Sequence, residues 1–253
     1  NTEELKVVRE KVTDLIQNSI DKNIPINHIC SIVGEINIAI TQRCIELSLE
    51  KMETPPPAQF SWINIGSQGR KEQFLLTDQD SILIFEDVAT EKYKDVKDYF
   101  LKLAKRATSI LEKVGYNFCP NGHMASNMLW CKSMSDWIKQ YNNWMKTPGE
   151  KSNDISSIFF DYELVFGEGK IEDSLDDLIL KNTKNNALFF DYLGNDTLRK
   201  NPPINFFKKF NLEEEGEHKG KFDIKNRAIM PLVDGARLFA ISLNLKGINN
   251  TYV

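Results

Sequence analysis

Cysteine and histidine are scarce in this sequence, which has 4 cysteines and 3 histidines in 253 residues. No two cysteines form a C-x-x-C pair, a spacing typical of zinc and redox motifs. Cys119 and His123 have a ligand-like spacing, but no second pair of soft ligands accompanies them, so a zinc site is not predicted there. Scattered cysteines in a chain of this size predict reduced thiols and a cytoplasmic protein.

Long apolar runs are absent as well. No segment is long and apolar enough to span a membrane, and the N-terminus has no signal-peptide core. We therefore expect no membrane partner. The first residue is Asn1 rather than Met, so we expect the chain to be a piece of a longer product.

The sequence also lacks an excess of positive charge. It has 32 Lys and Arg residues against 36 Asp and Glu residues, which gives a net charge of −4. Non-specific nucleic-acid binding depends on an excess of basic charge. Nucleic acid is therefore not a predicted partner, although the composition is compatible with a local basic patch.

Hydrophobic periodicity and chain-breaking residues divide the sequence into three predicted domains. Residues 1–54 carry two helical stripes separated by Asn23–Pro25, which predicts a helical hairpin. Residues 55–168 mix short apolar runs with helical stretches, which predicts an α/β (α+β) core with a mixed sheet flanked by helices. Residues 169–253 are mostly helical and are predicted to form a C-terminal domain that is incomplete at its end.

The core is expected to contain three strands and two helices. We predict strands over residues 59–65, 80–85 and 155–166, a helix over 92–114, and a second helix that begins at Ser133. In the last part of the chain we expect a short extended segment over residues 221–225. A final helix should follow, with Pro231 in its first turn because the missing N–H is not needed there.

A pair of acids ends the stretch Gly66–Asp80, which reads G-S-Q-G-R-K-E-Q-F-L-L-T-D-Q-D. Strand side chains alternate between two faces, so Asp78 and Asp80 should point the same way. Two carboxylates held this close repel each other unless water or a cation lies between them. Such oxygen ligands suit Mg²⁺ or Mn²⁺, whereas the same D-x-D taken alone also fits a solvated turn.

The residues around the acids favour a phosphate site over a solvated turn. Ser81–Phe85 is apolar on both faces, which predicts a buried strand with the acids at its mouth. Gly66 lets the backbone approach a phosphate, and the Ser67 hydroxyl at a helix start favours an anion. Arg70, one turn later, can hold phosphate oxygens through two parallel hydrogen bonds.

A third carboxylate is expected from a neighbouring strand, and Asp161 is the candidate. It is embedded in the apolar run I-F-F-D-Y-E-L, where an acid is costly unless it is paired or bound to a metal. The alternative is an edge-strand acid that faces water. Glu163 shares the face of Asp161 and is the reserve candidate.

The order strand, G-S, ten residues, D-x-D, strand resembles the core motif of the polymerase-β-like nucleotidyltransferase superfamily. The longer motif is similar to that of bacterial nucleotidyltransferases related to the N-terminal domain of protein-PII uridylyltransferase. Three further stretches resemble this group: Cys119–Asn127, Ser157–Gly167 and Pro231–Arg237. Asn121 and His123 depart from the group's pattern, so no catalytic role is assigned to that loop.

The resemblance implies transfer of a nucleoside monophosphate from an NTP to a hydroxyl of a protein or small-molecule acceptor, with Mg²⁺ or Mn²⁺ as cofactor. By this resemblance, the nucleotide phosphate lies against Gly66 and Ser67. The catalytic and metal-binding acids would be Asp78, Asp80 and Asp161, the last as a ligand or a base. Arg70 as a triphosphate contact rests on the physical argument alone.

The resemblance also implies a wider setting for the chain. In this group the domain commonly follows CBS or cyclic-nucleotide-binding domains, which implies a signalling protein. The helical residues 169–253 would be its substrate-binding domain. Two other functions are compatible with the sequence: a non-catalytic nucleotide sensor and a small-molecule nucleotidyltransferase of the antibiotic-modifying kind.

Overall fold

The computed structural model describes residues 1–75, 78–147, 157–199, 203–204, 206 and 208–245. The chain forms two compact units. One contains Asn1–Gln140 with Ile158–Leu178, and the other contains Tyr141–Ser157 with Ile179–Val253. The three-domain division made from the sequence stays a prediction.

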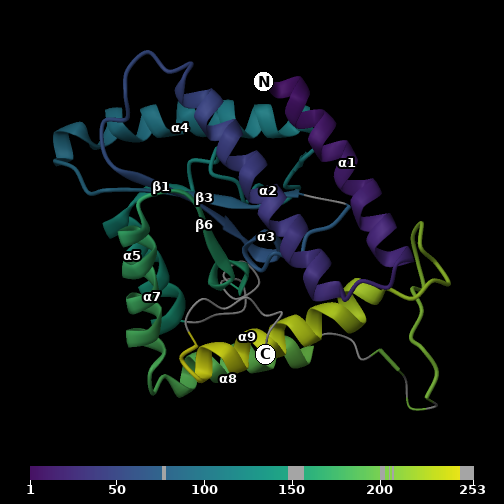
Figure 1. Ribbon diagram of the computed structural model, residues 1–253. Coiled ribbons are helices and arrows are strands. Elements are labelled where there is room, and N and C mark those ends of the chain that lie inside the picture. Colours follow the sequence, from purple (N-terminus) through teal and green to yellow (C-terminus); the bar gives the residue numbers. More distant parts are fainter. Residues whose placement is uncertain (76–77, 148–156, 200–202, 205, 207, 246–253) are drawn as a thin grey trace. The chain divides into compact units, whose positions relative to one another are not determined.

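A mixed sheet of four strands forms the centre of the first unit (Figure 1). The strands lie in the order β5-β3-β1-β6, with β1 antiparallel to both neighbours and β3 parallel to β5. Their bounds are β1 (Phe60–Ile65), β3 (Ser81–Phe85), β5 (Cys131–Ser133) and β6 (Tyr162–Gly167). A separate parallel pair joins β2 (Asp78–Gln79) to β4 (Asn117–Phe118). The mixed α/β fold class predicted from the sequence is confirmed.

The two inner strands follow the prediction closely and are covered on both sides. Every residue of β1 and β3 is buried, as expected for strands covered on both sides. Trp62 pairs with Leu83 in the middle of this antiparallel ladder. Both side chains are fully buried in the main hydrophobic core.

The strand predicted over residues 155–166 is wrong in its first half. Ser157–Phe160 forms a 3-10 helix (η1), and β6 begins only at Tyr162; residues 155–156 lie outside the described residues. Phe159 and Phe160 are both buried. Consecutive side chains in a strand would point to opposite faces, whereas a tight helical turn lets both reach apolar surroundings.

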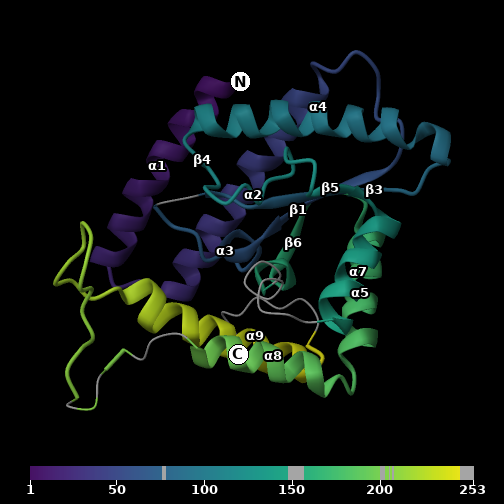
Figure 2. The same ribbon diagram turned by 180° about the vertical axis from the view of Figure 1, so that it is seen from behind.

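Helices α1 (Thr2–Asp21) and α2 (Ile26–Leu49) form the predicted hairpin. Asn1 caps α1, accepting a hydrogen bond from the backbone N–H of Glu4. Helix α4 (Thr90–Val114) runs across the sheet in both views (Figure 2). Its residues Phe100 and Leu103 share the core with the inner strands. Hydrophobic periodicity was therefore sufficient to predict these helices.

The other α-helices of the described residues are α3 (Gly66–Gly69), α5 (Met134–Lys146), α7 (Gly169–Thr183), α8 (Ala187–Arg199) and α9 (Met230–Ser242). Ser133 accepts a 3.4 Å hydrogen bond from the N–H of Asp136, as the predicted helix start requires. In the described part of the chain, no helix has both the length and the apolar character needed to cross a membrane.

The extended segment predicted over residues 221–225 is wrong at its end: residues 221–223 have no regular secondary structure, and the helical stretch begins at Ile224. Lys225–Ile229 forms a π-helix (η2) that leads directly into α9, and Pro231 lies at the start of α9 as predicted. Proline has no N–H to donate to the preceding turn, and its ring crowds that turn. The π-helix widens the helical stretch directly before this residue.

Candidate active site

The turn from β1 into α3 packs directly on the start of β6. Gly66 has φ +61°, a left-handed conformation that favours glycine, and its N–H donates a 2.8 Å hydrogen bond to the carbonyl of Asp161. A Cβ on Gly69 would lie 2.4 Å from that same carbonyl oxygen. Both glycines are thus needed for the close approach of turn and strand. Gly69 had no predicted role, although its spacing of three residues from Gly66 was a usable signal.

Asp78 and Asp80 flank the buried residue Gln79. Gln79 is buried, and its amide donates hydrogen bonds to the carbonyls of Thr108 at 3.1 Å and Tyr116 at 2.8 Å. The two acids on either side of it are half-buried. This pattern of burial agrees with the alternation expected from strand geometry, and the common face of the two carboxylates stays a prediction.

Asp80 lies beside the glycine turn. Its carbonyl accepts a 3.0 Å hydrogen bond from the N–H of Ile65, the last residue of β1. A Cβ on Gly66 would lie 3.8 Å from Asp80 Oδ2. The structure thus brings this carboxylate next to the Gly66–Ser67 step, two features that are separated in sequence by the whole loop between α3 and β2.

Asp161 has a different environment, in which the main neighbour is a cation. Its side chain is fully buried and its Oδ2 lies 2.5 Å from Arg70 Nη1. Arg70 is itself 6% exposed, and its Nε also donates to Glu72 Oε2 at 2.7 Å. A charge this deeply buried needs a partner of opposite sign. Asp161, the predicted third carboxylate, is thus ion-paired with Arg70, the predicted triphosphate-binding residue.

Glu163, the reserve candidate, is bound to a lysine nearer the surface. Its carboxylate lies 2.9 Å from Lys71 Nζ, which also contacts Glu35 at 2.9 Å. Lys71 has φ +56°, an uncommon conformation for a residue with a side chain. These contacts connect α2, the loop after α3 and β6 around the same turn.

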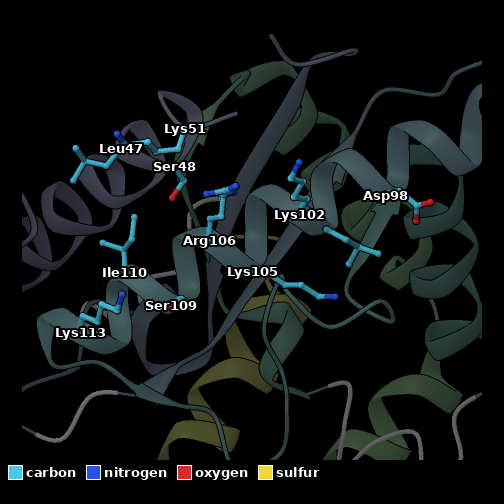
Figure 3. Close-up of a pocket in the computed structure, with 11 residues that line it drawn as sticks. Leu47, Ser48, Lys51, Asp98, Lys102, Lys105, Arg106, Ser109, Ile110 and Lys113 are labelled. Carbon is cyan, nitrogen blue, oxygen red and sulfur yellow. The ribbon is translucent and has the colours of Figure 1, made fainter. Parts of the chain in front are cut away.

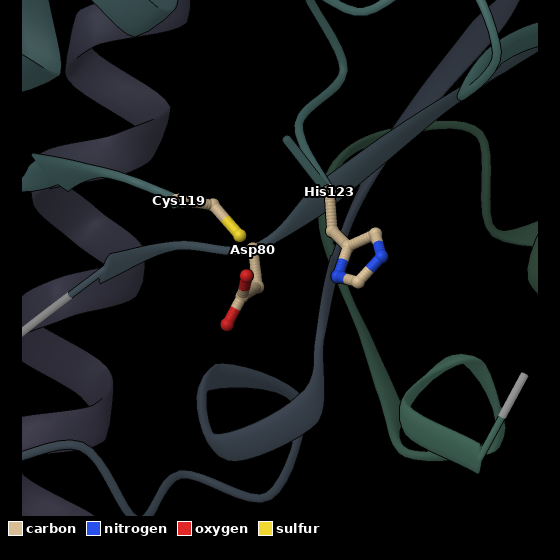
Figure 4. A group of neighbouring side chains, drawn as sticks. All are labelled: Asp80, Cys119 and His123. Atoms are coloured by element: carbon tan, nitrogen blue, oxygen red, sulfur yellow. The ribbon is translucent and has the colours of Figure 1, made fainter. Parts of the chain in front are cut away.

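Cys119 and His123 come together with Asp80, a group that sequence reasoning missed. One ligand atom from each of the three side chains lies within 4.8 Å of the others. Figure 4 shows the thiol and the imidazole on either side of the carboxylate. The parallel pairing of Asp78 with Asn117 explains this, because it carries Asp80 alongside Cys119. The sequence shows the Cys–His spacing but not the pairing that supplies the third donor.

Burial and the Asp80 charge set the protonation of the other two groups. Burial, with a hydrogen bond to Asp80 and its charge, raises the pKa of the Cys119 thiol to about 11. Burial lowers the pKa of His123 below its ordinary value, and the charge of Asp80 opposes this shift. At neutral pH the cysteine is therefore a thiol and the imidazole is neutral.

A hollow of about 560 Å³ lies between α2 and α4, away from the six predicted site residues, none of which lines it (Figure 3). Its basic side chains are Lys51, Lys102, Lys105, Arg106 and Lys113. Asp98 is the acid at its edge. This mildly acidic chain therefore carries a local basic patch, which its composition alone could not locate.

A family model described as "Putative nucleotidyltransferase DUF294" matches residues 10–151, more than half of the chain. The chain belongs to this nucleotidyltransferase family. A second model, described as "Putative nucleotidyltransferase substrate binding domain", matches residues 187–251. No curated protein gives a significant match to the chain. The resemblance seen in the sequence motifs is confirmed at the level of a nucleotidyltransferase family.

The first family match includes most of the predicted site of this nucleotidyltransferase. Gly66–Asp80 and the loop with Cys119 and His123 lie within residues 10–151, whereas Asp161 lies beyond them. The C-terminal match falls within the part of the chain for which a substrate-binding domain was predicted. The roles of individual residues stay predictions.

Proposed function

We propose that this protein transfers a nucleoside monophosphate from an NTP to an acceptor hydroxyl and releases pyrophosphate, with Asp78 and Asp80 holding Mg²⁺ or Mn²⁺. One observation carries the proposal. Asp80 lies beside the Gly66 turn, and Asp78 and Asp80 are half-buried on either side of buried Gln79. Membership in a nucleotidyltransferase family supports the class of reaction.

The donors and the space beside them fit a hard divalent cation. Carboxylate oxygens are the ligands that Mg²⁺ and Mn²⁺ prefer. The missing side chain at Gly66 keeps open the space next to Asp80 Oδ2. When bound, the metal would supply neutralisation of phosphate charge and a lower pKa for the acceptor hydroxyl.

The turn itself would position the nucleotide. We assign the Ser67 hydroxyl as a donor to a phosphate oxygen, because Ser67 follows Gly66 and is half-buried in the otherwise buried turn of α3. The hydrogen bond from the Gly66 N–H to the carbonyl of Asp161 fixes the position of the turn. Holding reactants in a fixed geometry is a large part of catalysis in phosphoryl transfer.

The roles of Arg70 and Asp161 depend on each other. The 2.5 Å ion pair occupies Arg70 Nη1 and Asp161 Oδ2, so a triphosphate or a metal bound by these residues would have to share them with the pair or open it. Their burial favours a simpler assignment, in which the pair holds α3 against the start of β6. We therefore propose Arg70 and Asp161 as positioning residues for the turn. Evidence that Asp161 binds a metal would overturn this assignment.

The acceptor hydroxyl would belong to a protein or to a small molecule. We propose that residues 187–251 contribute to its binding, because they match the model of a substrate-binding domain. CBS or cyclic-nucleotide-binding domains joined to this chain would then regulate the transfer in a signalling protein.

The test is transfer of label in a cell lysate. Wild-type protein and the Asp80→Asn variant are each incubated with Mg²⁺ and one α-labelled NTP at a time. We expect the wild type to label an acceptor and to release pyrophosphate, and the variant to do neither. Nucleotide binding without pyrophosphate release for every NTP would instead indicate a nucleotide sensor. Separation of protein from small molecules then identifies the class of acceptor.

A further inference from the structure

Three donor atoms of different chemistry converge where the loop after β4 meets the end of β2. They are a carboxylate oxygen of Asp80, the Sγ of Cys119 and a ring nitrogen of His123, within 4.8 Å of one another. Figure 4 shows all three side chains directed toward one region. Three protein ligands with a fourth position open are a common arrangement at zinc sites that bind water or a further group.

Hydrogen bonds fix the loop that carries the soft donors. The N–H of Gly122 donates to the carbonyl of Cys119 at 2.9 Å, and the N–H of Ser81 donates to the carbonyl of His123 at 2.9 Å. Asn127 Nδ2 donates to the carbonyl of Gly122 at 3.0 Å. The second of these bonds ties the histidine directly to the first residue of β3, next to Asp80.

Aromatic neighbours hold the imidazole ring itself. The ring of His123 lies edge-on to Trp130 and to Phe159, with centroid distances of 5.7 Å in both cases. Trp130 and Phe159 also contact each other at 4.6 Å, and both are buried. The donors are therefore positioned before any ligand arrives, which reduces the entropy lost on binding.

The donor set selects a different class of cation from Mg²⁺. Thiolate and imidazole suit Zn²⁺ and its neighbours in the first transition series, whereas Mg²⁺ favours oxygen ligands. Cysteine binds a metal as the thiolate, so binding at Cys119 releases the thiol proton to the buffer as the sulfur–metal bond forms.

We propose that Asp80, Cys119 and His123 form a binding site for a thiophilic divalent cation of the Zn²⁺ class. Resting on the proposed function, we further infer that this cation is an inhibitor. Asp80 cannot serve the Mg²⁺-dependent reaction while its oxygen is bound to a cation that is also held by sulfur and nitrogen. The site thus makes transferase activity sensitive to zinc.

Binding is tested with Co²⁺ as a spectroscopic probe and without nucleotide. We expect one Co²⁺ per chain, a thiolate-to-cobalt charge-transfer band, and displacement by Zn²⁺ but not by Mg²⁺. Removal of a residue that hydrogen-bonds to a metal ligand, without binding the metal itself, lowers metal affinity by about 10- to 100-fold. Cys119→Ser and His123→Gln should therefore weaken binding by at least about 100-fold, and Cys119→Ser should remove the band.

Matched controls are available for both variants. Cys30 has the same 7% exposure as Cys119, and His28 lies on the exposed surface of α2. Cys30→Ser and His28→Gln should leave the band and the affinity unchanged. The wild type gives a test that needs no variant: calorimetry in buffers of different ionisation enthalpy should show about one proton released per Zn²⁺. Zn²⁺ binding without proton release, or with equal affinity in Cys119→Ser, overturns the site.

Inhibition is tested separately, so that it fails independently of binding. In the labelling reaction with Mg²⁺, added Zn²⁺ should reduce the rate for the wild type. For each protein, the rate with Zn²⁺ is divided by its own rate without Zn²⁺. Inhibition of Cys119→Ser should need higher Zn²⁺ concentrations than inhibition of the wild type, by the same factor as its loss of affinity. If the wild type is inactive with Mg²⁺ alone, the proposed function and the inhibitory role both fall, and the cobalt experiment still decides the site.

Discussion

Asp80 and Asp161 were both predicted to be metal ligands, yet the fold gives them opposite surroundings. Asp80 is half-buried beside a glycine turn, a thiol and an imidazole. Asp161 is fully buried and lies against the guanidinium of Arg70. The difference teaches that an acid in an apolar run needs compensation, but that the sequence does not say whether a metal or an internal cation supplies it.

Neutralising Asp80 is the strongest test of this difference between the two acids. We expect Asp80→Asn to lower the rate of NMP transfer by roughly 10³-fold, because loss of a metal ligand removes several kcal/mol of transition-state stabilisation. The free energy of unfolding should change by less than about 1 kcal/mol, since the site is half-exposed. Pyrophosphate release and urea denaturation measure the two effects.

Glu112→Gln, on the exposed surface of α4, is the matched control. It removes one negative charge elsewhere in the unit and should leave the rate unchanged. A rate for Asp80→Asn within about threefold of the wild type, a change of less than 1 kcal/mol, would remove the metal assignment at Asp80.

The same substitution at Asp161 should act on stability. Asp161→Asn leaves the buried Arg70 with Glu72, which is partly exposed, and should lower the free energy of unfolding by about 3 kcal/mol. Arg70→Met should have a similar effect. The double variant should lose less than the sum of the two, because both buried charges are then gone.

Lys71→Met is the control for Arg70→Met, because Lys71 pairs with acids nearer the surface and should cost less than about 1 kcal/mol. Urea denaturation compares the four variants (Asp161→Asn, Arg70→Met, their double variant and Lys71→Met) with the wild type. If Asp161→Asn keeps wild-type stability and loses turnover, Asp161 is a metal ligand and the positioning role is excluded.

A smaller effect is expected at the backbone contact beside Asp161. Gly69→Ala places a Cβ 2.4 Å from the carbonyl oxygen of Asp161, so the turn must shift. We expect a loss of about 1–3 kcal/mol, as for other overpacked sites. The control is Gly235→Ala in α9, where nothing lies within 4 Å of the added Cβ; it should be neutral or slightly stabilising. Equal stability of the two variants would contradict the close approach.

The smallest effect concerns an acid whose neighbours are other acids. Burial raises the pKa of Glu172 above its ordinary value of 4.5, and the charges of Glu163, Asp176 and Asp173 raise it further, against a hydrogen bond from the Leu164 N–H. A raised pKa means that the group favours folding below about pH 4.5, and that this contribution is lost as the pH rises through the folded pKa.

At pH 7 the charged Glu172 therefore opposes folding. Glu172→Gln should raise the free energy of unfolding at pH 7 by up to about 0.5 kcal/mol, with a smaller gain at pH 4, by thermal or urea unfolding at both values. The exposed Glu168→Gln should show no such difference. A gain that is larger at pH 4 would reverse the assigned sign.

Much of the fold could be predicted from local patterns. Helical periodicity predicted α1, α2 and α4, and the apolar runs predicted β1 and β3 within a residue. The strand prediction failed where Phe159 and Phe160 enter the core together from a 3-10 turn. The extended segment predicted over residues 221–225 failed at its end, where Ile224 and Lys225 already belong to the helical stretch that continues into α9.

The candidate site divides in the same way. A common face for Asp78 and Asp80 is predicted from the period of two in a strand, and the burial of Gln79 between two half-buried acids agrees with it. The Asp80–Cys119–His123 group could not be predicted, because it depends on the pairing of β2 with a strand nearly 40 residues away. Likewise, no local signal tied Arg70 to Asp161.

The sequence by itself determined the mixed α/β class, the glycine turn, the paired acids and the family to which they belong. Each is encoded in neighbouring residues, through periodicity, glycine's access to left-handed backbone, and motif spacing. Only the tertiary structure decided which partner each acid has. An acid's charge is compensated by whatever the fold brings within a few ångströms, and for Asp80 and Asp161 those partners come from distant parts of the chain.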